Sequence, residues 1–247
     1  MNKKNSWKFF SAAILIVFSL IFYVINYFIF RNPHDIFFYL TIDLAFLPIN
    51  VLLVTLVIDT LLNQREKKSM LNKLNMVIGV FFSETGITLI RNFNQYFEDI
   101  ETISEKLSRI GKWDKKAFSK FKLNIHKHES RIKINGESEE NLKIYLGSKR
   151  DFLLRLLENP NLLEHETFTE LLRSVFHLTE EMACRESFKD QPESDLRHLE
   201  IDIKRVYFLL IKEWLSYMEY LKESYPYLHS LALRQNPFDK DASIIIK

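Results

Sequence analysis

The chain has 247 residues, and its 34 basic and 32 acidic side chains leave a formal net charge of only +2 at pH 7. This balance creates no large positive field, so net charge gives no reason to expect a nucleic-acid partner. The single cysteine, Cys184, excludes an internal disulfide and is typical of a reducing compartment. We expect it to be a small buried group on a helix.

Two long apolar runs follow one another at the start of the chain. The run from about residue 9 to residue 30 has no charged side chain, and the run at about 36–62 has only Asp43 and Asp59. At ~1.5 Å per residue, the first run forms a helix of about 33 Å, enough to cross a hydrocarbon core of roughly 30 Å. We therefore predict a transmembrane hairpin over residues 1–63, with these two runs as its spans.

The basic residues beside the two runs predict the orientation of the hairpin. Only Arg31 lies in the short turn, whereas both outer flanks are lysine-rich: Lys3, Lys4, Lys8, Arg65, Lys67, Lys68 and Lys73. Lys and Arg are retained on the cytoplasmic side, so both termini should be cytoplasmic in a multi-pass protein of the cell (inner) membrane. A cleaved signal peptide is the alternative, but no small-residue cleavage site follows the first run.

Low counts of helix-breaking residues, five glycines and six prolines, predict an all-α protein. We expect a juxtamembrane helix at 64–97, a cytoplasmic helical bundle at 98–235 and a loosely held tail at 236–247. The bundle helices are predicted at 98–110, 114–129, 139–158, 168–185 and 192–224, with a short helix ending near 234. Capping patterns set these limits: Gly111 at a C-cap, Asp114 and Ser138 at N-caps, and a capping box from Thr167 to Glu170.

Asp43 is the one acidic residue expected deep in a span. A carboxylate there costs about 2.5–3.5 kcal/mol on insertion scales, so it should face a polar partner or water. An antiparallel hairpin brings Asp43 to the depth of Tyr23 and Asn26, and Asn50 lies on the same helix face two turns on. This pattern is compatible with a transport-related subunit that uses Asp43 and Asn50. The pattern fits better an Asp that is hydrated or bonded to the first helix.

Motifs for metal or nucleotide chemistry are incomplete. His165, His177 and His198 could belong to a helical-bundle metalloenzyme, but the chain has no paired Glu-x-x-His and only one Asp-x-x-His, at 195–198. The five glycines are scattered and form no phosphate-binding loop. The turn between the spans is too short for the selectivity filter of a tetrameric cation channel. The sequence therefore predicts no catalytic residue, no cofactor and no metal, and it favours a protein that is not an enzyme.

Two further patterns suggest contacts with partners. Gly79, Ser83 and Gly86 lie on the juxtamembrane helix at a spacing that permits close helix approach, which suggests a homodimer. A basic segment, with Phe118, Phe121 and Ile125 on one helical face, contains Lys112, Lys115, Lys116, Lys120, Lys122, Lys127, Arg131 and Lys133. It either docks on an anionic leaflet or is a solvated face whose aromatic side chains join the core.

Several stretches of the chain resemble an uncharacterised prokaryotic family of two-span membrane proteins with a helical cytoplasmic domain. The resemblance lies in residues 73–84 and 150–166, in Tyr225-Pro226-Tyr227-Leu228 and in Asn236-Pro237-Phe238. It covers nearly the whole chain. It implies an inner-membrane protein and brings no activity, ligand or functional residue.

The sequence thus leaves the biochemical function unknown, with three hypotheses. The favoured one is a membrane-anchored cytoplasmic helical module for interaction or signalling, whose partners are the lipid bilayer and an unknown protein. The alternatives are the metalloenzyme around the three histidines and the transport-related subunit around Asp43. No feature indicates a nucleic-acid partner.

Overall fold

The computed structural model describes residues 3–125, 131, 132, 134, 137–162, 165–189 and 191–245. In this part of the chain the regular elements are helices and no β-strand is present, so the all-α prediction is confirmed. The chain divides into two units, Met1–Lys67 and Lys68–Lys247.

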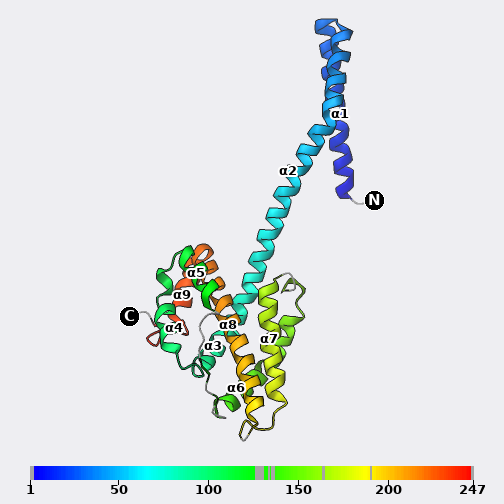
Figure 1. The fold of residues 1–247 in the computed structure, drawn as a ribbon. Coiled ribbons are helices and arrows are strands. Elements are labelled where there is room, and N and C mark those ends of the chain that lie inside the picture. The colour runs from blue at the N-terminus through cyan, green and yellow to red at the C-terminus, as the bar shows by residue number, and fades with distance from the viewer. Residues whose placement is uncertain are drawn as a thin grey trace. The chain divides into compact units, whose positions relative to one another are not determined.

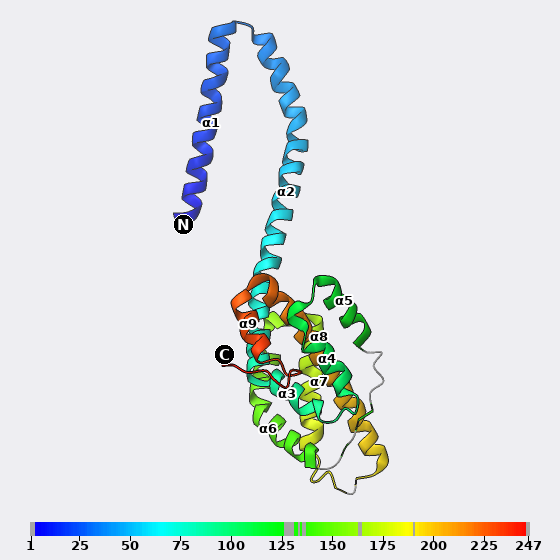
Figure 2. The ribbon, with the colours of Figure 1, turned by 90° about the vertical axis from the view of Figure 1, so that its left-hand side faces the viewer.

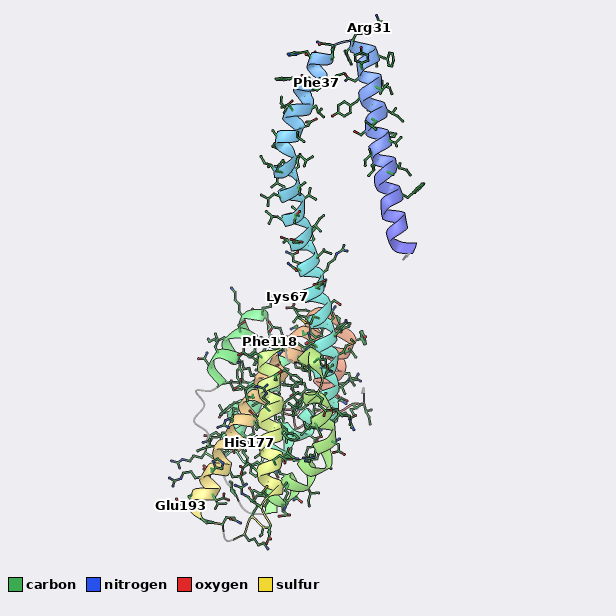
Figure 3. The ribbon with its side chains drawn as sticks, turned by 90° about the vertical axis from the view of Figure 1, so that its right-hand side faces the viewer. Arg31, Phe37, Lys67, Phe118, His177 and Glu193 are labelled. Carbon is green, nitrogen blue, oxygen red and sulfur yellow. The ribbon has the colours of Figure 1, made fainter. Side chains whose placement is uncertain are left out.

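The first unit is a helical hairpin. Helix α1 (Lys3–Phe30) and the first part of α2 (Pro33–Phe81) run in opposite directions from the turn that contains Arg31 (Figures 2 and 3). Arg31 adopts a left-handed backbone conformation with φ of 47°. The Asn32 side chain accepts a hydrogen bond from the His34 amide at 3.2 Å and donates one to the Asp35 carboxylate at 2.7 Å. Pro33 occupies the first helical position, where a missing N–H costs nothing. These residues reverse the chain within two positions.

The second unit begins within α2. After Phe81 the chain makes one π-helical turn, η1 (Phe82–Gly86), and continues as α3 (Ile87–Asn94). The remaining elements are α4 (Ile100–Leu107), η2 (Ile110–Lys112), α5 (Lys115–Asn124), α6 (Glu137–Leu157), η4 (Pro160–Leu162), α7 (Glu166–Ala183), α8 (Glu193–Ser224) and α9 (Pro226–Arg234).

Helix α8 organises the packing of the second unit. It contacts α3, α5, α7 and α9, and α7 packs against α6 on its other side (Figure 1). The stripe of apolar residues along α8 reaches the centre of the core at Tyr207 and Trp214, both at most 1% exposed. Phe97 stacks on Tyr207 with ring centroids 4.1 Å apart. Burial of each large apolar side chain stabilises the fold by about 1.5–3 kcal/mol.

The predicted helix limits are correct at some caps and wrong at others. Asp114 caps α5 as predicted, and its Oδ1 accepts a hydrogen bond from the Ala117 amide at 2.8 Å. The capping box at Thr167 is wrong, because α7 begins at Glu166 and His165 is its N-cap. Gly111 lies in the 3-10 turn η2 rather than at a helix C-cap, and α6 begins one residue before Ser138.

Two other predicted limits also change. Helix α5 ends at Asn124 rather than near residue 129, and residues 126–130 lie outside the described part of the chain. The tail is held more firmly at its start than predicted. Asn236 is buried and donates a hydrogen bond to the Leu107 carbonyl at 2.9 Å, and the ring of Phe238 packs 5.2 Å from that of Trp214. These contacts attach the first residues of the tail to the second unit.

Candidate functional site

The first candidate is the apolar hairpin itself. Two helical stretches near the N-terminus, Ala13–Phe30 and Pro33–Asn94, are long and apolar enough to cross a membrane, with mean hydropathies of 2.5 and 2.2 over their most apolar windows. No residue of these windows is buried inside the structure. Side chains such as Phe22 and Leu53 are 58% and 53% exposed. A helix in the core of a water-soluble protein would have most of these side chains covered.

Asp43 lines a pocket of mixed polar and apolar residues close to the turn of the hairpin. The pocket has a volume of about 310 Å³, and Tyr23 and Asn26 on α1 line it together with Asp43 on α2. Asn32 and Asp35 at the turn complete its polar lining. The structure therefore brings Asp43 to the two side chains that the antiparallel register predicted. Asn50, the second residue of the transport hypothesis, does not line this pocket.

Of the three histidines of the metalloenzyme hypothesis, His177 and His198 come together, and His165 has a separate role. His165 caps α7: its Nδ1 accepts a hydrogen bond from the Phe168 amide at 3.2 Å. His177 lies three turns further along α7 (Figure 3). His198 is on α8, and together with His177 it faces a residue that sequence reasoning missed, Asp202.

Asp202 is the centre of a small electrostatic cluster between α7 and α8. Its side chain is 4% exposed, and its Oδ2 lies 3.5 Å from the Nε2 of both His177 and His198. Its other oxygen, Oδ1, lies 3.2 Å from a guanidinium nitrogen of Arg205. Within the described residues, Oδ2 is buried and accepts no hydrogen bond of good geometry. One buried carboxylate thus faces three basic side chains that are each about half exposed.

The cluster is an ion-pair group between two helices. Among the described residues, no group of three or more His, Cys, Asp and Glu side chains is placed to hold a metal ion. The geometry instead indicates a structural role, since the carboxylate joins a residue of α7 to residues of α8. The spacing of four residues between His198 and Asp202 was the one sequence signal for it.

Removal of the Asp202 charge should weaken the contact between α7 and α8. We expect Asp202→Asn to lower the free energy of unfolding by about 1–2 kcal/mol, because the three basic side chains lose a shared carboxylate while the shape is kept. The urea midpoint of the full chain in detergent, measured by pulse proteolysis, checks this. Glu193→Gln, in a pair whose carboxylate is 86% exposed, is the matched control and should change little. An Asp202→Asn chain as stable as its parent would contradict the structural role.

A second ion-pair group closes the loop between α7 and α8. The guanidinium of Arg185 donates two hydrogen bonds to the Asp195 carboxylate, at 2.8 and 3.0 Å, and one to the Glu181 carboxylate at 2.9 Å. These hydrogen bonds from Arg185 hold the pKa of Asp195 below its usual value. Asp195 of the Asp-x-x-His pattern at 195–198 is therefore occupied as a partner of Arg185.

His229 on α9 is buried, and it makes folding sensitive to mild acid. Burial, with a smaller contribution from the Lys222 charge, lowers the pKa of His229. As pH falls below about 6.5, the unfolded chain binds a proton that the folded chain accepts only at lower pH, so stability falls by at most about 1.4 kcal/mol per pH unit. We expect the urea midpoint to drop more between pH 7.5 and pH 5.5 in the parent chain than in His229→Gln. Equal drops in both chains would exclude His229 as the cause.

Gly79 and Gly86, on the helix predicted at 64–97, already have neighbours in their own chain. A Cβ atom added to Gly79 would lie 2.7 Å from the Tyr217 hydroxyl, and one added to Gly86 would lie 2.5 Å from the ring of Phe82. Both glycines therefore serve packing within the second unit, and a homodimer through this helix stays a prediction. The prediction for Cys184 is wrong: the residue is exposed at the end of α7.

The three apolar side chains of the basic segment, Phe118, Phe121 and Ile125, differ in their burial. Phe118 and Ile125 are buried in the core, as the solvated-face interpretation requires. Phe121 is only half-buried and lines an apolar pocket with basic side chains at its edge. Lys127 and Lys133 lie outside the described residues.

Comparisons with known proteins place these features in a family. The family model described as "MJ1433, N-terminal helical domain" matches residues 2–62, and "Uncharacterized protein MJ1433, C-terminal helical domain" matches residues 70–234. The uncharacterised protein MJ1433 of the archaeon Methanocaldococcus jannaschii is 44% identical over 245 residues, 99% of this chain and 98% of that protein. No solved structure matches. The resemblance to an uncharacterised prokaryotic family is thereby confirmed, and the relative brings no activity with it.

Proposed function

Because this chain belongs to the family of the uncharacterised protein MJ1433, which has two helical domains, we propose that the first domain anchors the second to a membrane. In this proposal the protein is a two-span protein of the cell membrane. The second domain is a cytoplasmic module that binds a partner protein and carries no reaction of its own.

The observation that carries the proposal is the exposure of two adjacent apolar helices. Within the described structure no residue in the most apolar window of α1 or of α2 is buried. In water such a surface would drive aggregation, whereas lipid chains cover it at no cost. The backbone hydrogen bonds of both helices are made within each helix, as the interior of a bilayer requires.

The orientation follows from the charges around the hairpin. The turn contains Arg31 beside Asp35, whereas lysines and arginines precede the first helix and follow the second apolar run. The positive-inside rule then directs the turn outward and the second domain into the cytoplasm. The one cysteine of the chain is exposed and unpaired, which suits a reducing compartment.

An interaction role for the second domain is supported by its closed core and its exposed apolar side chains. The core buries large aromatic residues such as Phe168 and Trp214, which leaves no need for a ligand at its centre. Large apolar side chains that remain more than half exposed on helices of this domain include Leu123, Ile144, Ile201 and Tyr227. Exposed apolar side chains are the usual anchors of protein contacts.

A topology measurement tests the anchor. Cells that express the full chain with a reporter after Lys247 should show the reporter active only in the cytoplasm, and the protein should stay in the membrane pellet after a carbonate wash. A reporter active outside the cytoplasmic membrane would overturn the orientation. Recovery of the protein in the supernatant without detergent would overturn the anchor.

Crosslinking tests the interaction role. A photo-crosslinking residue placed at Ile144, Ile201 or Tyr227 in the full chain should capture one reproducible protein in intact cells, identified by mass spectrometry. The same residue at Phe168, which is fully buried, is the matched control and should capture none. Crosslinks to lipid alone from all three exposed positions would contradict a protein partner.

The polar side chains beside Asp43 in its pocket favour a transport-related subunit as a second candidate. Tyr23 and Asn26 face the carboxylate across the hairpin, as in a path for a proton or an ion. If Asp43 has this role, Asp43→Asn should abolish the cellular function while the protein stays in the membrane. If Asp43 is only a hydrated polar residue, Asp43→Leu should leave function unchanged and strengthen insertion by about 3 kcal/mol.

A further inference from the structure

An apolar pocket with a basic edge lies in the second unit, between α4, η2 and α5. Its volume is about 560 Å³. Trp113, Ala117, Phe121 and Ile125 form most of its lining, so the interior is largely apolar. The indole of Trp113 packs against Phe121, with ring centroids 5.1 Å apart, which fixes the wall that both rings form.

Three basic side chains stand around this apolar interior: Lys106 and Arg109 beside α4, and Lys120 on α5. All three are exposed, and Glu105 is the one acidic residue of the lining. None of the three basic side chains forms an ion pair with a residue in the part of the chain that the structure describes. The pocket edge therefore carries a local excess of two positive charges.

Two other lysines of α5 form ion pairs with α8, unlike the basic side chains at the pocket edge. Lys115 and Lys122 lie seven residues apart on the face toward α8, where each lies 2.7 Å from a carboxylate, that of Glu223 and of Glu219 respectively. These two lysines hold α5 on α8. Lys120 points to the pocket and is left for a ligand.

We propose that this pocket binds an anionic lipid of the membrane that carries the protein. The lipid phosphate lies between Lys106, Arg109 and Lys120, and the adjoining part of its apolar chain lies against Trp113 and Phe121. This inference rests on the proposed membrane anchor. The inference assigns a ligand to the second domain, and it explains why basic side chains gather at the edge of this pocket.

The chemistry of the pocket selects a lipid over other anions. A free phosphate would satisfy the three cations and leave the aromatic wall exposed to water. An acidic peptide would likewise place charged side chains beside an apolar lining, at a desolvation cost. Only an anionic amphiphile satisfies both parts, because its charge and its apolar chain are joined in one molecule.

Trp113 provides a built-in probe for the test. The full chain with Trp7→Phe leaves two tryptophans, and Trp214 is 1% exposed and shielded in the core. This protein is incorporated into nanodiscs of neutral phospholipid that contain increasing amounts of an anionic phospholipid with brominated chains. Neutral brominated phospholipid at the same mole fractions is the lipid control. We expect the anionic lipid to quench Trp113 at a mole fraction at least tenfold lower than the neutral lipid.

A charge-matched pair of variants locates the binding. Each cation near an anionic headgroup contributes about a fivefold gain in affinity, the equivalent of ~1 kcal/mol. Lys106→Gln, Arg109→Gln and Lys120→Gln together should therefore raise the half-quenching mole fraction more than tenfold. The control removes three exposed cations outside the pocket, Arg155→Gln, Arg173→Gln and Lys189→Gln, and should leave that value unchanged.

Each remaining outcome overturns the lipid pocket. Equal effects of the two triple variants would mean diffuse attraction to a charged surface. Equal quenching by neutral and anionic lipid would mean that no headgroup is selected. A change of Trp113 fluorescence with soluble poly-glutamate, absent with anionic lipid, would assign the pocket to an acidic protein. Failure of the anchor is distinct from all of these, because the chain would then be missing from the isolated nanodiscs.

Discussion

Replacement of Leu20 and Ile21 by arginine should prevent the first apolar helix from crossing the membrane. Both side chains lie near the middle of α1, where they are 59% and 49% exposed and unsupported by other parts of the structure. Exchange of one central aliphatic residue for arginine costs about 3 kcal/mol on insertion scales, so the pair costs about 6 kcal/mol.

Labelling of the turn measures this effect. The reference protein carries Asn32→Cys in a Cys184→Ser background, and a maleimide that cannot cross membranes should label it in intact cells from which any outer barrier has been removed. In the Leu20→Arg, Ile21→Arg protein the turn should stay inside, and labelling should be lost. Ile144→Arg with Leu154→Arg, at exposed positions of α6, is the matched control and should keep the labelling. A labelled turn in the double-arginine protein would show that α1 is not a span.

The helices could be predicted because their signals are local. Apolar residues recur at three- and four-residue steps along α8, and an Asp placed just before α5 reaches the first free amides of its own helix. The start of α7 was missed because two residues compete there. Thr167 fits the pattern of a capping box, but His165 occupies the cap, and its ring nitrogen accepts the hydrogen bond from Phe168.

The candidate sites could be predicted only in part, because each joins helices that are distant in the sequence. The antiparallel hairpin fixes a register by its short turn, so the approach of Tyr23 and Asn26 to Asp43 followed from counting residues. Counting residues from a short turn cannot predict which residues of α7 and α8 come into contact. His177 meets Asp202 across 25 positions of sequence through the packing of two helices, which depends on every side chain between them.

Gly79 and Gly86 also show that sequence spacing does not identify a contact partner. Their spacing correctly indicated a close approach of another group, but the sequence could not identify that group. The structure supplies Tyr217 of α8 for Gly79, with its ring stacked on Phe82 at 5.6 Å. A small-residue motif therefore predicts that another group approaches the helix closely. It does not tell whether that group belongs to the same chain or to another one.

Loss of Trp214 should have a large effect, this time on the fold of the second unit. Its side chain is 1% exposed at the centre of α8, and truncation of a buried aromatic residue of this size costs about 3–5 kcal/mol. We expect Trp214→Ala to reduce the urea concentration at the unfolding midpoint to less than half of the parent value. Pulse proteolysis of the second unit, in the full chain in detergent, measures this midpoint. Tyr227→Ala, where the side chain is 71% exposed, should stay within about 0.5 kcal/mol of the parent.

The same substitution tests whether the start of the tail is part of the core. Phe238 is 3% exposed and packs on Trp214, so both residues share one contact surface. Phe238→Ala alone should destabilise the second unit by about 3 kcal/mol or more. In the double variant the loss of unfolding free energy should be smaller than the sum of the two single losses by about 0.5–3 kcal/mol, because contacting residues do not act independently. Full additivity would mean that Phe238 does not pack on Trp214 in solution, and that the chain after Arg234 is as loosely held as its sequence predicts.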